Sequence, residues 1–186
     1  MKHRLIIILV VAIVLPARAA LALELGFSPS DVFPVWININ QTLITYAKHL
    51  PADDDWQQRL AAMAPRKFRD KVPGDVLALA EAFNRRASHL RQGPPVHKEE
   101  SVFEKEVRFL FKDNLQATPS LVLLRSSHLL VQMVEAFLDI SNENQLIGRF
   151  FAETTVSGKT PSDVFGQVDL ALRRLEKILA RERPAT

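Results

Sequence analysis

The sequence predicts an all-α fold of about seven helices, arranged as repeats of one long helix and one shorter helix. Its strongest sign is a six-residue segment that occurs four times and places a proline at positions 29, 73, 119 and 161. The intervals of 44, 46 and 42 residues are near-constant, as in proteins built from stacked structural units. Hardly any segment after residue 22 alternates apolar and polar residues over the length of a strand. Four such units can form either a compact bundle or a short solenoid.

Each copy of the segment is typical of a helix start. Proline suits the first helical position, because the N–H that it lacks would be unpaired there and its φ is already helical. A preceding hydroxyl residue can cap the helix, and an acid two residues after the proline favours the positive end of the helix dipole. The second copy has Val72 in place of the hydroxyl residue, and the third has Leu121 in place of the acid. The expected structural caps are Ser28, Asp31, Asp75, Thr118, Thr160 and Asp163.

Apolar residues follow each proline at offsets of 3, 4, 7, 10 or 11, 14 and 17 or 18, which is one face of a helix. In the first copy these positions hold Val32, Phe33, Trp36, Ile39, Leu43 and Tyr46. The same spacing in all four copies predicts four long helices that share one buried face.

Three shorter segments between the long ones are predicted to be return helices. The first runs from Trp56 to Ala64 after three aspartates, the second covers 99–114, and the third covers about 142–154. Each has apolar residues at helical spacing, and turn residues such as Pro51, Gly93 and Gly158 separate the units.

The first 22 residues are typical of a secretory signal peptide. A basic opening is followed by an apolar run over 5–15 and by small-residue sites that predict cleavage near Ala19 or Ala22. An uncleaved membrane anchor is the alternative, although Pro16 and Arg18 interrupt the run before it reaches the roughly 20 apolar residues of a spanning helix. We therefore expect residues 23–186 to form a single exported domain that does not span a membrane, in a bacterial periplasm or outside the cell.

Charge excludes one class of function. Three of the 24 basic residues lie in the leader, so residues 23–186 carry 21 basic and 21 acidic side chains. A neutral chain gives no support to nucleic-acid binding, which needs a concentrated positive face. The basic clusters at 66–71 and 173–183 fit solvated surface and helix C-termini, with an anionic partner as the less favoured interpretation.

Motifs for chemistry are absent from the sequence. It contains no cysteine, no Gly-x-Ser-x-Gly segment, no paired metal-binding histidines and no haem attachment motif. Ser126 and Ser127 precede His128 on one predicted helix, where such near neighbours do not face each other. The three repeat aspartates fit capping better than a shared site for a cation or a basic peptide. We therefore expect no catalytic residue, no metal site and no cofactor.

Two classes of function remain. The first is a non-catalytic interaction module that holds another envelope protein on a face of the stacked helices. The second is a binder of a lipid or another small apolar ligand in a pocket between helices. The residues expected to line such a pocket are Phe83, Phe103, Phe111, Phe137 and Phe150.

Overall fold

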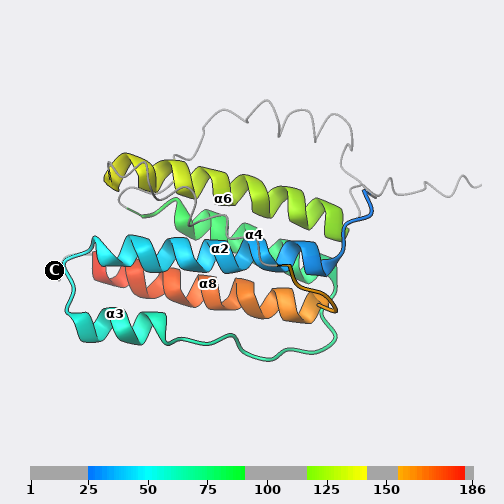
Figure 1. Cartoon of the computed structure of the whole chain (residues 1–186), viewed down its shortest axis with the longest axis horizontal. Helices are drawn as coiled ribbons and strands as arrows, with labels where there is room; N and C mark the ends of the chain where they lie inside the picture. Colours follow the sequence, from blue (N-terminus) through cyan, green and yellow to red (C-terminus); the bar gives the residue numbers. More distant parts are fainter. Residues whose placement is uncertain (1–24, 91–116, 142–154, 183–186) are drawn as a thin grey trace, which may run out of the picture.

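The computed structural model describes residues 25–90, 117–141 and 155–182, and these residues are all-helical and compact, with no strand (Figure 1). Five helices lie in this part of the chain. They are α2 (Pro29–Lys48), α3 (Asp54–Ala61), α4 (Pro73–Ala87), α6 (Pro119–Ser141) and α8 (Pro161–Glu182). Two of the predicted short helices, at 99–114 and 142–154, lie outside the described residues.

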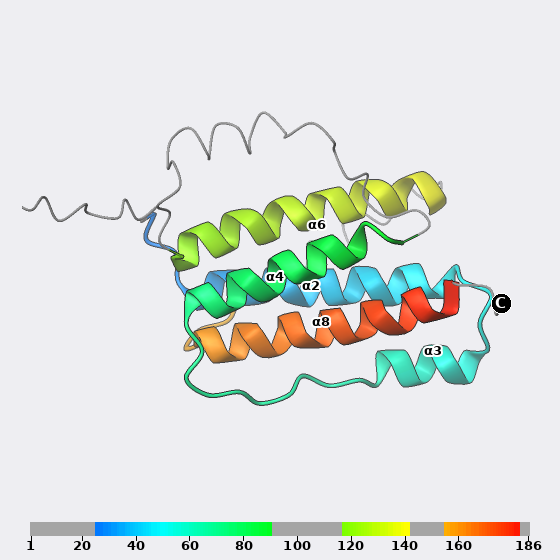
Figure 2. The same cartoon turned by 180° about the vertical axis from the view of Figure 1, so that it is seen from behind.

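The four long helices are parallel, and each begins at one of the four prolines. Figures 1 and 2 show all four starts at the same end of the bundle. The four prolines and the valines three residues after them surround one apolar cavity of about 10 Å³ at this end. Because consecutive long helices run in the same direction, the chain has to return along the bundle after each one.

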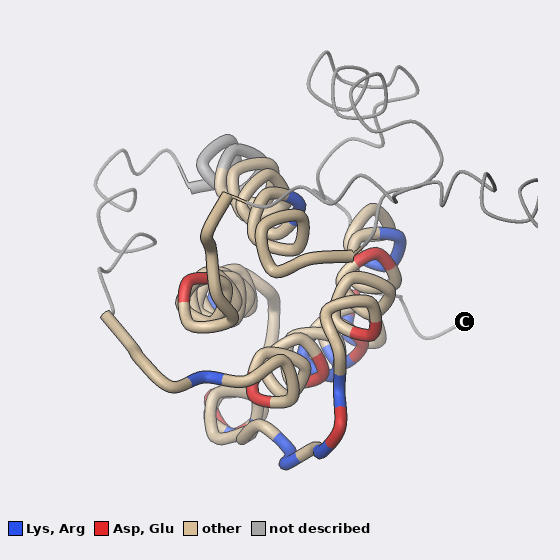
Figure 3. The backbone as a smooth tube through the Cα atoms, turned by 90° about the vertical axis from the view of Figure 1, so that its right-hand side faces the viewer, with Lys and Arg blue, Asp and Glu red and all other residues tan. Residues whose placement is uncertain are grey.

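The helices follow one another around the bundle in the order α2, α8, α4 and α6. Helix α2 packs on α6 and α8, and α4 also packs on α6 and α8, least extensively on α6. Figure 3 looks along the bundle from the end at which the helices begin, so that this end faces the viewer. Of the consecutive long helices, only α4 and α6 are therefore neighbours in space, whereas α8 lies between α2 and α4.

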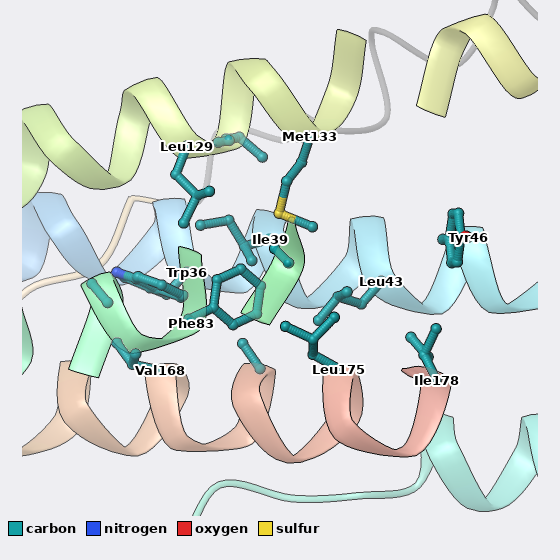
Figure 4. Close-up of a cluster of buried hydrophobic side chains, with 14 of the residues drawn as sticks. Trp36, Ile39, Leu43, Tyr46, Phe83, Leu129, Met133, Val168, Leu175 and Ile178 are labelled. Atoms are coloured by element: carbon teal, nitrogen blue, oxygen red, sulfur yellow. The ribbon is translucent and has the colours of Figure 1, made fainter. Parts of the chain in front are cut away.

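The core consists of layers to which each long helix contributes one residue. Buried residues occur 3, 7, 10 and 14 positions after each proline, a spacing of alternately three and four residues that is typical of coiled coils. The layer at offset 14 contains Leu43, Ala87, Met133 and Leu175, all fully buried. Figure 4 shows how side chains from the four helices meet in this core. Residues at offset 4, including Phe33 and Phe165, pack half-buried against its edge.

Large and small side chains compensate within the layer at offset 7. Trp36 is fully buried there, and the corresponding residues of α4 and α6 are the small Ala80 and Ser126. The Trp36 indole N–H donates a buried hydrogen bond of 2.9 Å to Ser126 Oγ, and its ring meets Phe83 edge-on with 5.5 Å between centroids. The single hydroxyl in this layer therefore gives the tryptophan N–H its partner.

Helix α3 is the one described return helix, and it ends earlier than predicted, at Ala61 instead of Ala64. Pro65 disfavours helical conformation in the residue before it. From there the chain runs without regular structure along α8 to the start of α4 (Figure 2). It passes so close to α8 that a Cβ added to Gly166 would lie 2.7 Å from the Arg66 carbonyl oxygen.

Candidate functional site

The aspartates of the first and fourth helix starts are fixed by their own caps. Asp31 Oδ2 accepts hydrogen bonds from the Ser28 N–H and hydroxyl, both at 2.7 Å. Asp163 Oδ2 accepts the same pair from Thr160 at 2.8 Å. These hydrogen bonds, from the backbone first and the hydroxyl second, lower the pKa of both carboxyl groups below the ordinary aspartate value.

Each of the two inner starts has only one of the two capping side chains, the aspartate in α4 and the hydroxyl residue in α6. In α4 the Asp75 carboxylate accepts the Val72 N–H at 3.1 Å, and in α6 the Thr118 hydroxyl accepts the Leu121 N–H at 3.2 Å. Each hydrogen bond joins residues of the same helix start. Among the described residues, no group of three or more His, Asp or Glu side chains is arranged to hold a metal ion.

A second set of hydrogen bonds joins neighbouring helix starts. The serine after the proline accepts a backbone N–H from the segment that leads into the next helix around the bundle. Three such bonds are present: Lys159 N–H to Ser30 at 3.0 Å, Lys71 N–H to Ser162 at 3.1 Å, and Leu25 N–H to Ser120 at 3.1 Å. We call these contacts the serine clamps. They join α2 to α8, α8 to α4, and α6 to α2.

Lysine–aromatic contacts accompany two of the clamps. Lys159 Nζ lies 4.6 Å from the Phe33 ring centroid, and Lys71 Nζ lies 4.7 Å from that of Phe165. A cation at this distance over an aromatic face is attracted by the ring. The pairs α2–α8 and α8–α4 are therefore each joined by a serine clamp and by a lysine–aromatic contact.

The pair α4 and α6 lacks both devices. Its clamp position holds Gly74, the residue in the place of the lysine is Ala117, and the residue in the place of the phenylalanine is Leu77. The hydroxyl, the cation and the aromatic ring are therefore all missing where α4 meets α6. We call this pair of helix faces the open seam.

The open seam contains a groove of about 220 Å³. Its lining comes from one face of each helix, namely Leu77, Ala80, Glu81, Asn84 and Arg85 of α4 and Arg125, His128, Leu129 and Gln132 of α6. Ala80 and Leu129 are buried, whereas Glu81, Asn84 and Arg85 are exposed. The groove therefore combines an apolar floor with polar walls that reach solvent.

The described residues that line the groove carry an excess of positive charge. Two guanidinium groups, from Arg85 and Arg125, lie on opposite walls, and Glu81 is the one carboxylate among the lining residues. The other polar side chains are the amides of Asn84 and Gln132 and the imidazole of His128. Such a lining can donate hydrogen bonds to carboxylate or carbonyl oxygens.

Ser126 and His128 are close in the sequence, but their side chains have different surroundings in the structure. Ser126 faces the core, where it accepts the Trp36 N–H, whereas His128 lines the groove. The two side chains therefore lie on different faces of α6.

Of the five phenylalanines expected to line a pocket, Phe83 is fully buried in the core and is not part of the groove lining. Phe103, Phe111 and Phe150 lie outside the described residues, as does the side chain of Phe137 on α6.

A buried arginine was not expected from the sequence. Arg174 Nη1 donates to Asn40 Oδ1 at 3.0 Å, and its other nitrogens donate to the carbonyl oxygens of Leu60, Ala61 and Met63 at 3.0–3.2 Å. Burial, and then the charge of Arg173, lower its pKa from the ordinary arginine value. Arg174 therefore caps the end of α3 and ties this helix to α2 and α8.

These features define the class of protein: an all-helical bundle of four parallel helices with one open seam. No profile of a known protein family, no curated protein and no solved structure matches the chain. Within the described part, none of the helices has the length and apolar character needed to cross a membrane.

Proposed function

We propose that this protein is an exported, non-catalytic interaction module that binds a segment of another cell-envelope protein in the groove of the open seam. The groove between α4 and α6 is the observation that carries this proposal. Its volume of about 220 Å³ lies below the roughly 300–1,000 Å³ of typical small-molecule sites. It suits one or two side chains of a polypeptide better than a whole lipid.

The polar walls also favour a polypeptide over a lipid. An acyl chain in the groove would cover Asn84, Gln132 and the two arginines without offering them hydrogen bonds, and such burial of polar groups is costly. A peptide offers carbonyl oxygens and N–H groups to the same side chains. The apolar-ligand hypothesis remains a prediction for the phenylalanines outside the described residues.

The proposal includes the repeat and the leader. We infer four units of about 44 residues, each a long helix followed by a return segment, with about seven helices in all and the last unit truncated. Loss of the clamp between α4 and α6 would adapt one seam of an otherwise closed bundle to a partner. Removal of residues 1–22 would release residues 23–186 into the periplasm or the medium, which N-terminal sequencing of the exported protein can test.

Site-specific photocrosslinking tests the groove directly. We expect benzoylphenylalanine at Asn84 or Gln132 to give a discrete protein adduct in living cells. The matched control is Glu176, an exposed residue of α8, the helix opposite α6 in the bundle. Adducts of equal yield at Glu176, or none at either groove position, would contradict the proposal.

A further inference from the structure

We propose that the groove of the open seam recognises a glutamate side chain of its polypeptide partner, with Arg85 and Arg125 holding the carboxylate. This inference rests on the proposed function and specifies the chemistry of the partner. It comes from the charges on the walls, the character of the floor and the size of the groove.

The charges favour a carboxylate. Arg85 and Arg125 approach the groove from different helices, so that an acid between them meets a guanidinium group on each side. Arginine binds carboxylates through paired hydrogen bonds that are shorter and stronger than those between neutral groups. A lysine side chain in the same place would meet two like charges and one carboxylate, that of Glu81.

The floor favours a side chain with an apolar stem. Ala80 and Leu129 are buried at the base of the groove, with half-buried Leu77 beside them. The methylene groups of glutamate can cover this apolar floor while its carboxylate stays at the level of the arginines. A volume of about 220 Å³ admits such a side chain without any rearrangement of the helices.

The α6 wall of the groove is partly fixed before a partner arrives. Arg125 and His128 are half-buried on α6, and both already have an interaction partner within the chain. Side chains that are held in place lose less conformational entropy when they bind.

Three capped dipeptides that differ only in charge provide the test: N-acetyl-Leu-Glu-amide, N-acetyl-Leu-Gln-amide and N-acetyl-Leu-Lys-amide. Each is titrated into the isotope-labelled exported protein while its backbone amide resonances are followed by NMR. We expect the glutamate probe to shift the groove residues of α4 and α6 saturably, about tenfold more tightly than the glutamine probe, because hydrogen bonds to charged groups are the stronger ones. The lysine probe should bind least tightly. Added salt should weaken the binding of the glutamate probe, because salt screens the attraction between its carboxylate and the arginines.

Substitutions locate the effect. Arg85→Gln and Arg125→Gln should each reduce the affinity for the glutamate probe several-fold and bring it toward that of the glutamine probe. Arg59→Gln is the matched control, because Arg59 is exposed on α3 and pairs with Asp55 of its own helix. Because Arg85 is exposed, its variant remains informative even if Arg125→Gln perturbs the fold.

Equal affinities for the glutamate and glutamine probes, shifts confined to residues outside the open seam, or no saturable shift at all would overturn the inference. The two experiments distinguish this inference from the proposed function. Crosslinking at Asn84 or Gln132 without a preference for the acidic probe would support the groove as a docking site and reject the recognition of glutamate. If neither crosslinking nor a preference for the acidic probe is found, the docking site itself is rejected.

Discussion

At the scale of single residues, the buried Arg174 donates four hydrogen bonds, which join three helices. Its guanidinium group donates to one side-chain oxygen and to three carbonyl oxygens at the end of α3. Three of these four acceptors are carbonyl groups at the C-terminal end of α3 or just after it, where carbonyl groups have no N–H partner from a following helical turn. One buried side chain thus holds the short helix against two long ones.

We expect Arg174→Lys to lower the free energy of unfolding by about 2–4 kcal/mol, because lysine keeps the charge but cannot reach all four acceptors. Urea denaturation followed by circular dichroism measures the loss. Arg173→Lys is the control, since Arg173 is partly exposed and makes an ion pair with Asp169 of the same helix and one exposed hydrogen bond to the Ala64 carbonyl oxygen. Similar losses for the two variants would show that the buried hydrogen bonds of Arg174 contribute little.

The sequence contained a sign of this burial that our interpretation of the basic cluster did not use. Arg174 lies three residues after Ala171 and four before Ile178, both buried, so it falls on the apolar face of its helix. Its acceptors could not be predicted, because Asn40 and the end of α3 lie more than 100 residues away in the chain. The groove residues were missed for the same reason, since Arg85 and Arg125 become neighbours only through tertiary packing.

At the scale of elements, the starts of the four long helices were the most predictable feature, because proline and the capping residues act locally. All four helices begin at the predicted prolines. The end of α3 was less predictable, because it depends on Pro65 and on Arg174 from another helix. The serine of the repeated segment was not singled out in the sequence, because its role is to bind a different helix start.

We expect Gly74→Ser to raise the free energy of unfolding by about 1 kcal/mol. A Cβ at Gly74 would lie 3.7 Å from the Ala117 Cβ, an ordinary contact, so that the new hydroxyl has room to accept the Ala117 N–H, as Ser30 and Ser162 accept the N–H groups of Lys159 and Lys71. The gain combines better helix propensity with one added hydrogen bond. Thermal unfolding monitored by circular dichroism detects a change of this size.

Gly74→Ala separates the two contributions, because alanine improves helix propensity without adding a hydroxyl. The serine variant should be at least as stable as the alanine variant, although alanine is the better helix former. A clearly more stable alanine variant would mean that no fourth clamp forms.

At the scale of the whole molecule, the order of the four long helices around the bundle was not predictable from the sequence. The pattern of long and short segments allowed a bundle or a solenoid, and α8 packs between α2 and α4, which are distant from it in sequence. Parallel packing brings four positive helix ends together at one end of the bundle. Asp31, Asp75 and Asp163 place negative charge at three of these four ends.

The stability of the bundle should therefore fall in acid. The pKa values of Asp31 and Asp163 are lowered by folding, so their carboxylates stabilise the folded state above the ordinary aspartate pKa of about 4. This contribution is lost as the pH falls through the lowered values. We expect Asp31→Asn with Asp163→Asn to cost about 1–2 kcal/mol near pH 7, from two exposed caps. The difference from the unsubstituted protein should shrink toward zero near pH 2.

Urea denaturation across this pH range measures the difference directly. Glu176→Gln is the matched control, because it removes one exposed carboxylate in the second half of α8, away from the four proline starts. Its effect should be small, within about 0.5 kcal/mol at either pH. A stability difference that is the same near pH 7 and near pH 2 would show that the charge of the caps does not stabilise the parallel bundle. Only their shape or hydrogen bonding would then contribute, and the alignment of four helix dipoles would need another source of compensation.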